Sequence, residues 1–285
     1  MLFAFRKKIL IAGPYTGEFG WELMGWQGWV RKLRRKYDST IVISYANSEY
    51  LYEECQFYPH SIELRNSSYG YGCLPEEARL IAVNNCAREL GISSYDWFSH
   101  HMLKWPVKIL LGGQEFIKYY EPPANGIKFD IVFHFRDFHR DDGDQKNLDR
   151  RSADEIISWA RNYFSIACIG DPDLSYCPCG AIDKRSRFLK ETIRTICSAR
   201  LVVGGSSGPM HLSSLCGIPI LVWIGPPADI ERYLSYWNPL RSKVFVLTDQ
   251  TFKPPTSIII EKIETLFNHD LTRWECSQKG TIYNK

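Results

Sequence analysis

The stretch of the chain best suited to bind an anion joins an apolar segment to a helix. Leu201–Val203 is apolar, and Gly204-Gly205-Ser206-Ser207-Gly208 follows it directly. Pro209 suits the first turn of a helix, and Ser206 or Ser207 can cap that helix. Free backbone N–H groups and the dipole at a helix start attract anions, and glycines let a phosphate approach the backbone. The alternative is a tight strand-to-helix turn that binds nothing.

The elements around this turn alternate between strand and helix along almost the whole chain. Repeated strand–helix units predict parallel sheets with helices on both faces. Strands are expected at Lys8–Ala12, Thr40–Tyr45, Ser61–Leu64, Val107–Leu111, Phe129–Phe135, Ser165–Ile169, Arg200–Val203, Ile220–Ile224 and Val244–Leu247. Helices are expected at Trp21–Tyr37, Pro75–Leu90, Ala153–Phe164, Arg185–Ala199, Pro209–Cys216, Ala228–Tyr236 and Ser257–Phe267.

A proline-rich stretch, Glu121–Gly126, separates two runs of this alternation and is the best candidate for a linker. We therefore expect an α/β protein of two Rossmann-like domains, residues 1–122 and 127–268, followed by a polar tail at 269–285. Doubly wound parallel sheets bind ligands at the carboxyl ends of their strands. A functional site is expected in the cleft between the two domains.

The longer string from Ala199 to Gly225 resembles the C-terminal signature of the ADP-heptose:lipopolysaccharide heptosyltransferase family, glycosyltransferase family nine. The residues that match are Ser207, Gly208, Pro209, Met210, His211, Leu212, Gly217, Pro219 and Gly225. Ser206 stands where the family has an Asp that helps to bind the nucleotide-sugar donor. The resemblance covers the chain from Ala153 on, and the N-terminal half diverges. It implies a GT-B glycosyltransferase with the acceptor on the first domain and the donor on the second.

Two loops of the second domain are implied to contact the donor. In the resembled family, basic residues after the first strand of this domain contact the donor phosphates, and the planar fork of arginine suits a diphosphate. His211 would contact a phosphate or ribose, unless it is a buried structural histidine. The expected donor-binding residues are Arg136, Arg140, Lys146, Gly205, Ser206, Ser207, Gly208, Pro209, Met210 and His211.

The loop Gly13–Leu23 is the expected place of a catalytic base. Its glycines come near the GxGxxG fingerprint, but Ser44–Asn47 lacks the acidic residue that a dehydrogenase needs. The resembled family has a Gly-Asp pair here, and Gly17-Glu18 looks like that pair, whereas counting back from the helix end points to Glu22. Such a carboxylate would remove the proton of the acceptor hydroxyl. The acceptor itself is expected at Tyr15, Thr16, Gly17 and Trp21.

Each of these glutamates also has a structural interpretation. Glu18 would then be a solvated loop residue, and Glu22 would be a first-turn acid that the helix dipole favours.

The chain also contains a possible metal motif. Asp142-Gly143-Asp144 matches the DxD with which metal-dependent GT-A transferases hold a cation against a diphosphate. The motif is common by chance, as a second match at Asp171-Pro172-Asp173 illustrates. The two-domain pattern also favours GT-B over GT-A. We expect no metal and no cofactor, with the nucleotide-sugar as a co-substrate.

Charge and cysteine content limit the other possibilities. A net charge of +3 excludes a strongly basic nucleic-acid coat but allows a local patch. Nine cysteines, an odd number with one CxC at Cys177 and Cys179, favour free thiols in a reducing compartment over disulfides or zinc. No apolar run reaches the ~18 residues of a membrane span. A cytoplasmic location is expected.

A run of five cations ends the first long helix and forms the one candidate patch, the basic run. It is either a solvated helix terminus or a surface for an anionic partner, such as a membrane surface or a nucleic acid. Its members are Arg31, Lys32, Arg34, Arg35 and Lys36.

The sequence thus predicts an inverting, metal-independent GT-B glycosyltransferase. It would move a hexosyl or heptosyl group from a nucleotide-sugar to a saccharide, lipid-linked or nucleic-acid acceptor. One alternative is a viral-type DNA-modifying glycosyltransferase that acts on a hydroxylated base, for which the aromatic residues, 14% of the chain, would stack on bases. The other is a non-catalytic nucleotide- or sugar-binding protein that kept the fold and lost the base.

Overall fold

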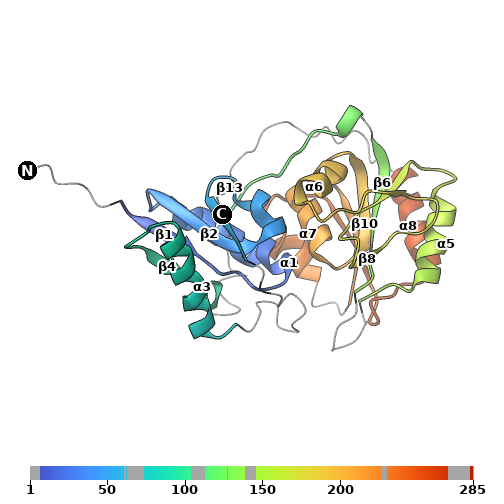
Figure 1. The fold of residues 1–285 in the computed structure, drawn as a ribbon. Helices are drawn as coiled ribbons and strands as arrows, with labels where there is room; N and C mark the ends of the chain where they lie inside the picture. The colour runs from blue at the N-terminus through green and yellow to red at the C-terminus, as the bar shows by residue number, and fades with distance from the viewer. Residues whose placement is uncertain are drawn as a thin grey trace, which may run out of the picture. The chain divides into compact units, whose positions relative to one another are not determined.

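The computed structural model describes residues 7–60, 62, 74–103, 113–126, 128–138, 146–225, 230–268 and 283–284. The chain divides into two compact units, Met1–Glu115 with Asn284–Lys285, and Phe116–Tyr283. This division falls before the proline-rich stretch that the sequence predicts as a linker. Each unit contains a parallel sheet with helices, so the chain is an α/β protein, as predicted (Figure 1).

The first unit contains a four-stranded parallel sheet in the order β3-β2-β1-β4. Its strands are β1 (Ile9–Ala12), β2 (Ser39–Tyr45), β3 (Gln56–His60) and β4 (Asp96–Phe98). The third strand of the chain is Gln56–His60, and the strand predicted at Ser61–Leu64 lies, apart from Ile62, outside the described residues. β3 contains Pro59, which an edge strand tolerates because one side of its backbone has no partner strand. The strand predicted at Val107–Leu111 lies outside the described residues.

The helix predicted at Trp21–Tyr37 consists of three segments. They are α1 (Phe19–Trp21), the π-helix η1 (Glu22–Trp26) and α2 (Gln27–Arg34). Short π segments inside helices are frequent at functional sites. The other helical elements of this unit are the 3-10 helices η2 (Ala46–Tyr52) and η3 (His100–Met102) and the helix α3 (Glu76–Glu89).

Alternation along the strands decides what each face of this sheet contacts. Ile41 and Ile43 of β2 pack with Ile11 of β1 against Val83 and Cys86 of α3. Successive side chains of a strand point to opposite faces, so Ser44, the residue after Ile43, points away from α3.

The second unit contains a seven-stranded sheet in the order β12-β11-β10-β6-β7-β9, with β8 antiparallel to the end of β6. All other pairs are parallel. The strands are β6 (Phe129–Arg136), β7 (Ile166–Cys168), β8 (Ser175–Tyr176), β9 (Ile182–Asp183), β10 (Ala199–Gly205), β11 (Ile220–Ile224) and β12 (Val244–Thr248). Two short strands, β5 (Glu115–Phe116) and β13 (Tyr283–Asn284), pair with each other.

Helices cover both faces of the seven-stranded sheet, α5 and α8 on one and α6 and α7 on the other (Figure 1). Ile156 and Ile157 of α5 and Ile259 and Ile263 of α8 share one core with the sheet. The helical elements are η4 (Ala124–Gly126), α5 (Arg150–Ala160), α6 (Leu189–Cys197), α7 (Gly208–Leu215), the π-helix η6 (Arg232–Tyr236) and α8 (Thr256–Asn268). Across the described ranges, no helix has the length and apolar character needed to cross a bilayer.

The order of strands in this unit contains one reversal. The chain starts the sheet at β6, adds β7 and β9 on one side, and then returns to add β10, β11 and β12 on the other. The direction of the connections therefore reverses between β6 and β10. In doubly wound sheets a ligand binds outside the carboxyl ends of the two strands at this reversal.

Candidate functional site

The carboxyl ends of β6 and β10 bring two predicted donor residues to the same edge of the sheet. Gly204 of β10 is in register with His134 of β6. Two residues further along the chain from these partners come Ser206, the residue after β10, and Arg136, the last residue of β6, so both lie at the reversal point. The Arg136 guanidinium lies 5.5 Å from the centre of the Phe138 ring.

The helix α7 begins directly after these strand ends. Ser207 is its N-cap, and Pro209 in the first turn has no N–H to leave unpaired. The side chain of Ser207 does not cap the helix, and its buried Oγ has no hydrogen-bond partner among the described residues. The first-turn amides of Gly208 and Met210 have no partner within the helix, because the first N–H groups of any α-helix have none. These donors all suit an anion.

Ser206 is bound by a residue that the sequence does not single out. The hydroxyls of Tyr233 and Ser206 are 2.9 Å apart. Two hydroxyls that bond to each other use one of their two protons. Because Tyr233 is buried and Ser206 is partly exposed, Ser206 can present the second proton to a ligand. An Asp at this position would only accept hydrogen bonds at neutral pH.

His211, on the first turns of α7, is buried and stacks on Tyr233, with ring centres 4.6 Å apart. Burial, reinforced by the charges of Arg232 and Lys146, lowers its pKa to about 3. The imidazole is therefore neutral at physiological pH, with two cations nearby. Lys146 is a donor residue that the sequence predicts. The sequence does not single out Arg232, Tyr233 or Trp237, because the pattern at 228–236 predicts a helix but not that it packs beside α7.

The structure describes only some of the remaining predicted donor residues. Gly205 ends β10 and is buried, as is Met210 on α7. Arg140 and the possible metal motif at Asp142 and Asp144 lie outside the described residues. Within the described part of the chain, no three His, Cys, Asp or Glu side chains are grouped so that they could hold a metal ion.

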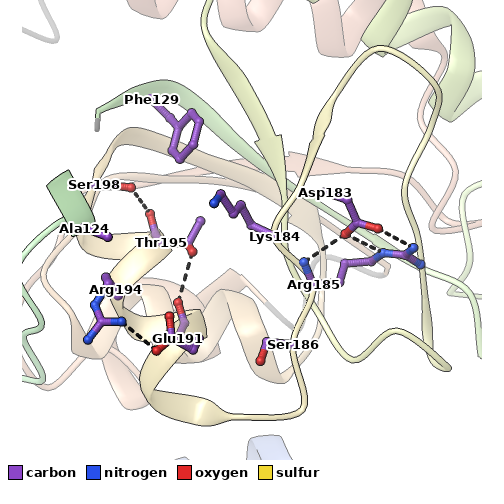
Figure 2. A pocket seen from close by; sticks show the side chains of 10 residues that line it. All are labelled: Ala124, Phe129, Asp183, Lys184, Arg185, Ser186, Glu191, Arg194, Thr195 and Ser198. Atoms are coloured by element: carbon purple, nitrogen blue, oxygen red, sulfur yellow. Dashed lines mark hydrogen bonds and ion pairs between the residues drawn. The ribbon is translucent and has the colours of Figure 1, made fainter. Parts of the chain in front are cut away.

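A separate pocket of about 250 Å³ lies elsewhere in the second unit (Figure 2). Its arginines are neutralised within the fold, because Arg185 pairs with Asp183 at 2.7 Å and Arg194 with Glu191 at 2.6 Å. Phe129, at the amino end of β6, lines it, which places that wall at the opposite end of this strand from Arg136. The lining residues are Ala124, Phe129, Asp183, Lys184, Arg185, Ser186, Glu191, Arg194, Thr195 and Ser198.

In the first unit, ring-bearing side chains hold the loop after β1 by its carbonyl groups. The Tyr45 hydroxyl donates to the Thr16 carbonyl at 2.8 Å, and the Tyr15 hydroxyl donates to the Glu18 carbonyl at 2.8 Å. His60 Nε2 lies 2.6 Å from the carbonyl oxygen of Tyr15. Side chains locked in this way keep a loop in one conformation.

The predicted acceptor residues lie along this loop. Tyr15 and Thr16 are fully buried, and the Tyr15 ring packs against Trp26 and His100. Gly17 is buried too, whereas Trp21 is partly exposed.

The two candidate bases have different surroundings. Glu22 is completely buried, and its carboxylate accepts hydrogen bonds from Ser44 Oγ at 2.5 Å, Ser48 Oγ at 2.7 Å and the Tyr52 hydroxyl at 3.1 Å. Glu18 is the N-cap of α1 and is partly exposed. Glu18 is thus the carboxylate that a substrate can reach without rearrangement of the first unit.

Most of the basic run is engaged within the fold. Arg31 is buried, Arg34 pairs with Glu54 at 2.8 Å, and Arg35 pairs with Glu115 at 2.5 Å. Any contact of this run with an anionic partner would therefore depend mainly on the two cations without an ion pair in the described ranges. These are Lys32 and Lys36.

No protein-family model matches the sequence, and no curated protein matches it either. Solved structures do match the fold. A glycosyl transferase family 9 protein from Veillonella parvula matches with a TM-score of 0.58 at 12% identity, over 93% of this chain and 98% of that one. The ADP-heptose lps heptosyltransferase II of E. coli matches with a TM-score of 0.56 at 13% identity, over 90% and 98% of the two chains.

The E. coli heptosyltransferase WaaC, solved with ADP, also matches, with a TM-score of 0.53 at 10% identity over 90% of this chain and 99% of that one. The chain therefore has the fold of the family nine glycosyltransferases, which confirms the resemblance predicted from the sequence. The likeness also includes the N-terminal half, where the sequence diverges from the family.

Buried neutral histidines make the stability of the fold depend on pH. His134 and His211 have pKa values lowered to about 4 and about 3, mainly by burial. Below about pH 6.5 the unfolded chain binds protons on these imidazoles and the folded chain does not, so acid favours unfolding. We predict that the free energy of unfolding falls as the pH is lowered from about 6.5 to about 4, by up to about 1.4 kcal/mol per pH unit for each histidine.

Denaturant titrations of the wild type and His134→Gln at several pH values in this window check the prediction. Glutamine retains an N–H that can reach the Ile169 carbonyl, the present partner of His134 at 3.1 Å. The variant should show a shallower pH dependence. Equal slopes for the two proteins would contradict the assignment of a neutral buried His134.

Proposed function

We propose that the protein is a GT-B glycosyltransferase that binds the diphosphate of a nucleotide-sugar donor at the start of α7. The observation that carries the proposal is the convergence of hydrogen-bond donors at the strand reversal, in a chain with the fold of family nine glycosyltransferases. Ser206 and Ser207 contribute hydroxyls, Gly208 contributes an amide, and Arg136 ends β6 at the same edge of the sheet.

The structural neighbours support a nucleotide-sugar as the donor. WaaC has been solved with ADP and with ADP-2-deoxy-2-fluoro heptose, the latter matching this chain with a TM-score of 0.54. Where the family has an Asp, which only accepts hydrogen bonds at neutral pH, this chain has Ser206, whose hydroxyl can donate one. A group that only accepts hydrogen bonds, such as a phosphate oxygen, would suit Ser206 better than a sugar hydroxyl.

In the proposed reaction the acceptor hydroxyl attacks the anomeric carbon of the donor sugar while a carboxylate removes its proton, and the nucleoside diphosphate leaves. Attack from the face opposite the leaving group inverts the anomeric centre. Amides of α7 and the guanidinium of Arg136 would stabilise the charge that develops on the leaving diphosphate. We assign the base to Glu18, since Glu22 is enclosed by three hydroxyls.

Donor binding is tested first, by thermal and denaturant unfolding with nucleoside diphosphates. A ligand at about 100 times its Kd should add about 2.7 kcal/mol to the free energy of unfolding. We predict that Gly208→Asp abolishes this gain, because a carboxylate then occupies the place of the phosphate. Ser186→Asp is the matched control, since it adds the same charge to the pocket of Figure 2. Loss of stabilisation in Ser186→Asp alone would move the donor site to that pocket.

Catalysis is tested with Glu18→Gln, which keeps the size of the side chain but cannot accept a proton at neutral pH. We predict that kcat falls by about 10²–10⁴-fold, the usual contribution of a general base. Donor affinity should remain near wild type, because every described donor residue belongs to the second unit.

Glu22→Gln is the internal control and should lower thermal stability more than turnover. If Glu22→Gln alone abolishes turnover, the base is Glu22. If neither substitution matters, the proposed base is wrong, and His100 or His101 becomes the next candidate. Donor binding without any transfer or hydrolysis would instead indicate a non-catalytic binding protein.

Metal independence is a separate expectation of the GT-B proposal. Turnover in the presence of EDTA should equal turnover without it, because protein donors alone are proposed to neutralise the diphosphate. Activity that is lost with EDTA and restored by Mn²⁺ or Mg²⁺ would assign a metal to Asp142 and Asp144.

A further inference from the structure

Two cysteines of the second unit lie near each other, one at the end of β7 and the other directly after the end of β8. Cys168, the last residue of β7, is in register with Phe133 of β6. β8 runs antiparallel along the same side of β6, with Tyr176 opposite Phe135. The residue after Tyr176 therefore returns toward the end of β7. Cys177 packs against the core cluster that contains Cys168, and the two thiols are close enough to shift each other's pKa.

The loop between the two cysteines is held in place by its own hydrogen bonds. Ser175 Oγ donates to the Asp171 carbonyl at 2.6 Å, and the Leu174 amide donates to the same carbonyl at 3.0 Å. Gly170 has a φ of +129°, and a Cβ there would lie 2.5 Å from Ser175 Oγ, so only glycine allows this close return. The fold therefore keeps the two cysteines near each other.

The two thiols have different surroundings. Cys168 is completely buried, whereas Cys177 is partly exposed. The neighbouring Cys168 thiol lowers the pKa of Cys177, and Arg185 lowers it further, against the effects of burial and Asp183. The neighbouring Cys177 thiol, together with burial, raises the pKa of Cys168. Cys177 is thus the thiol that a reagent reaches and the one that ionises first.

We propose that Cys168 and Cys177 are a thiol–disulfide exchange site that a small-molecule disulfide, such as oxidised glutathione, converts to an internal disulfide. The Cys177 thiolate attacks one sulfur of the reagent, forms a mixed disulfide and releases one glutathione thiolate. Cys168 then loses its proton to that thiolate or to solvent and attacks the Cys177 sulfur. The second glutathione leaves as a thiolate that takes up a proton, so two protein thiols are oxidised and one reagent disulfide is reduced.

The internal disulfide would join the end of β7 to the end of β8. β8 also pairs with Arg136, because Ser175 is opposite Arg136 in the register. The modification therefore acts on the strand that borders the end of β6. The proposal depends on the two thiols alone and does not require the proposed transferase activity.

The test is oxidation of the folded full-length protein with oxidised glutathione, followed by proteolysis without reduction and mass spectrometry of the peptides. The wild type should yield a Cys168–Cys177 cross-linked peptide that has lost two hydrogens, and dithiothreitol should reverse it. Cys168→Ala should stop at the intermediate, with one glutathione on Cys177. Cys177→Ala should leave Cys168 unmodified, because Cys168 is buried.

Cys179→Ala is the matched control, since Cys179 is exposed and only two residues from Cys177. It should form the Cys168–Cys177 disulfide as the wild type does. A Cys177–Cys179 link in the wild type, or glutathione on Cys179 with Cys177 unmodified, would overturn the proposal. Circular dichroism confirms the fold of each variant, and Cys168→Ser replaces Cys168→Ala if the latter does not fold.

Discussion

The parallel pairing of β6 with β10 is the constraint on which the candidate donor site depends. Backbone hydrogen bonds between these strands fix Gly204 against His134, and this register determines where Arg136 ends β6 and where Ser206 follows β10. A slip of one residue would turn every side chain of one strand to the opposite face. Ser206 and Arg136 are therefore brought together by backbone geometry, before any side chain of either strand contacts a ligand.

The other elements supply the hydrogen-bond donors and the charge at this edge of the sheet. α7 adds amides directed at the reversal point, and η6 brings Tyr233 against Ser206 and stacks it on His211. Burial, reinforced by the charges of Arg232 and Lys146, keeps that imidazole neutral, so the positive charge of the region comes from side chains whose charge does not change near pH 7. Such a region attracts anions over a wide pH range.

Sequence patterns predict the long buried strands and most helices, because a strand such as β11 or a helix such as α8 carries its own apolar signal. They do not predict β8 and β9, each two residues long, whose pairing depends on neighbouring strands. The sequence predicts the GGSSGPMH turn, because the backbone requirements of this turn are local. It does not predict the role of Tyr233, because that role depends on a contact between residues 27 positions apart in the chain. Likewise, nothing local distinguishes the burial of Glu22 from the partial exposure of Glu18.

The enclosure of Glu22 also constrains how this sequence can change over time. Ser44, Ser48 and Tyr52 each donate to one buried carboxylate, so removing any of these hydroxyls while the carboxylate remains weakens the solvation of a buried charge. If an apolar residue replaces Glu22 first, the same three hydroxyls lose their shared acceptor instead. The four positions are therefore energetically coupled, and substitutions there are expected to accumulate together and in a preferred order. Homologues that lack the glutamate should accordingly lack the three hydroxyls as a set.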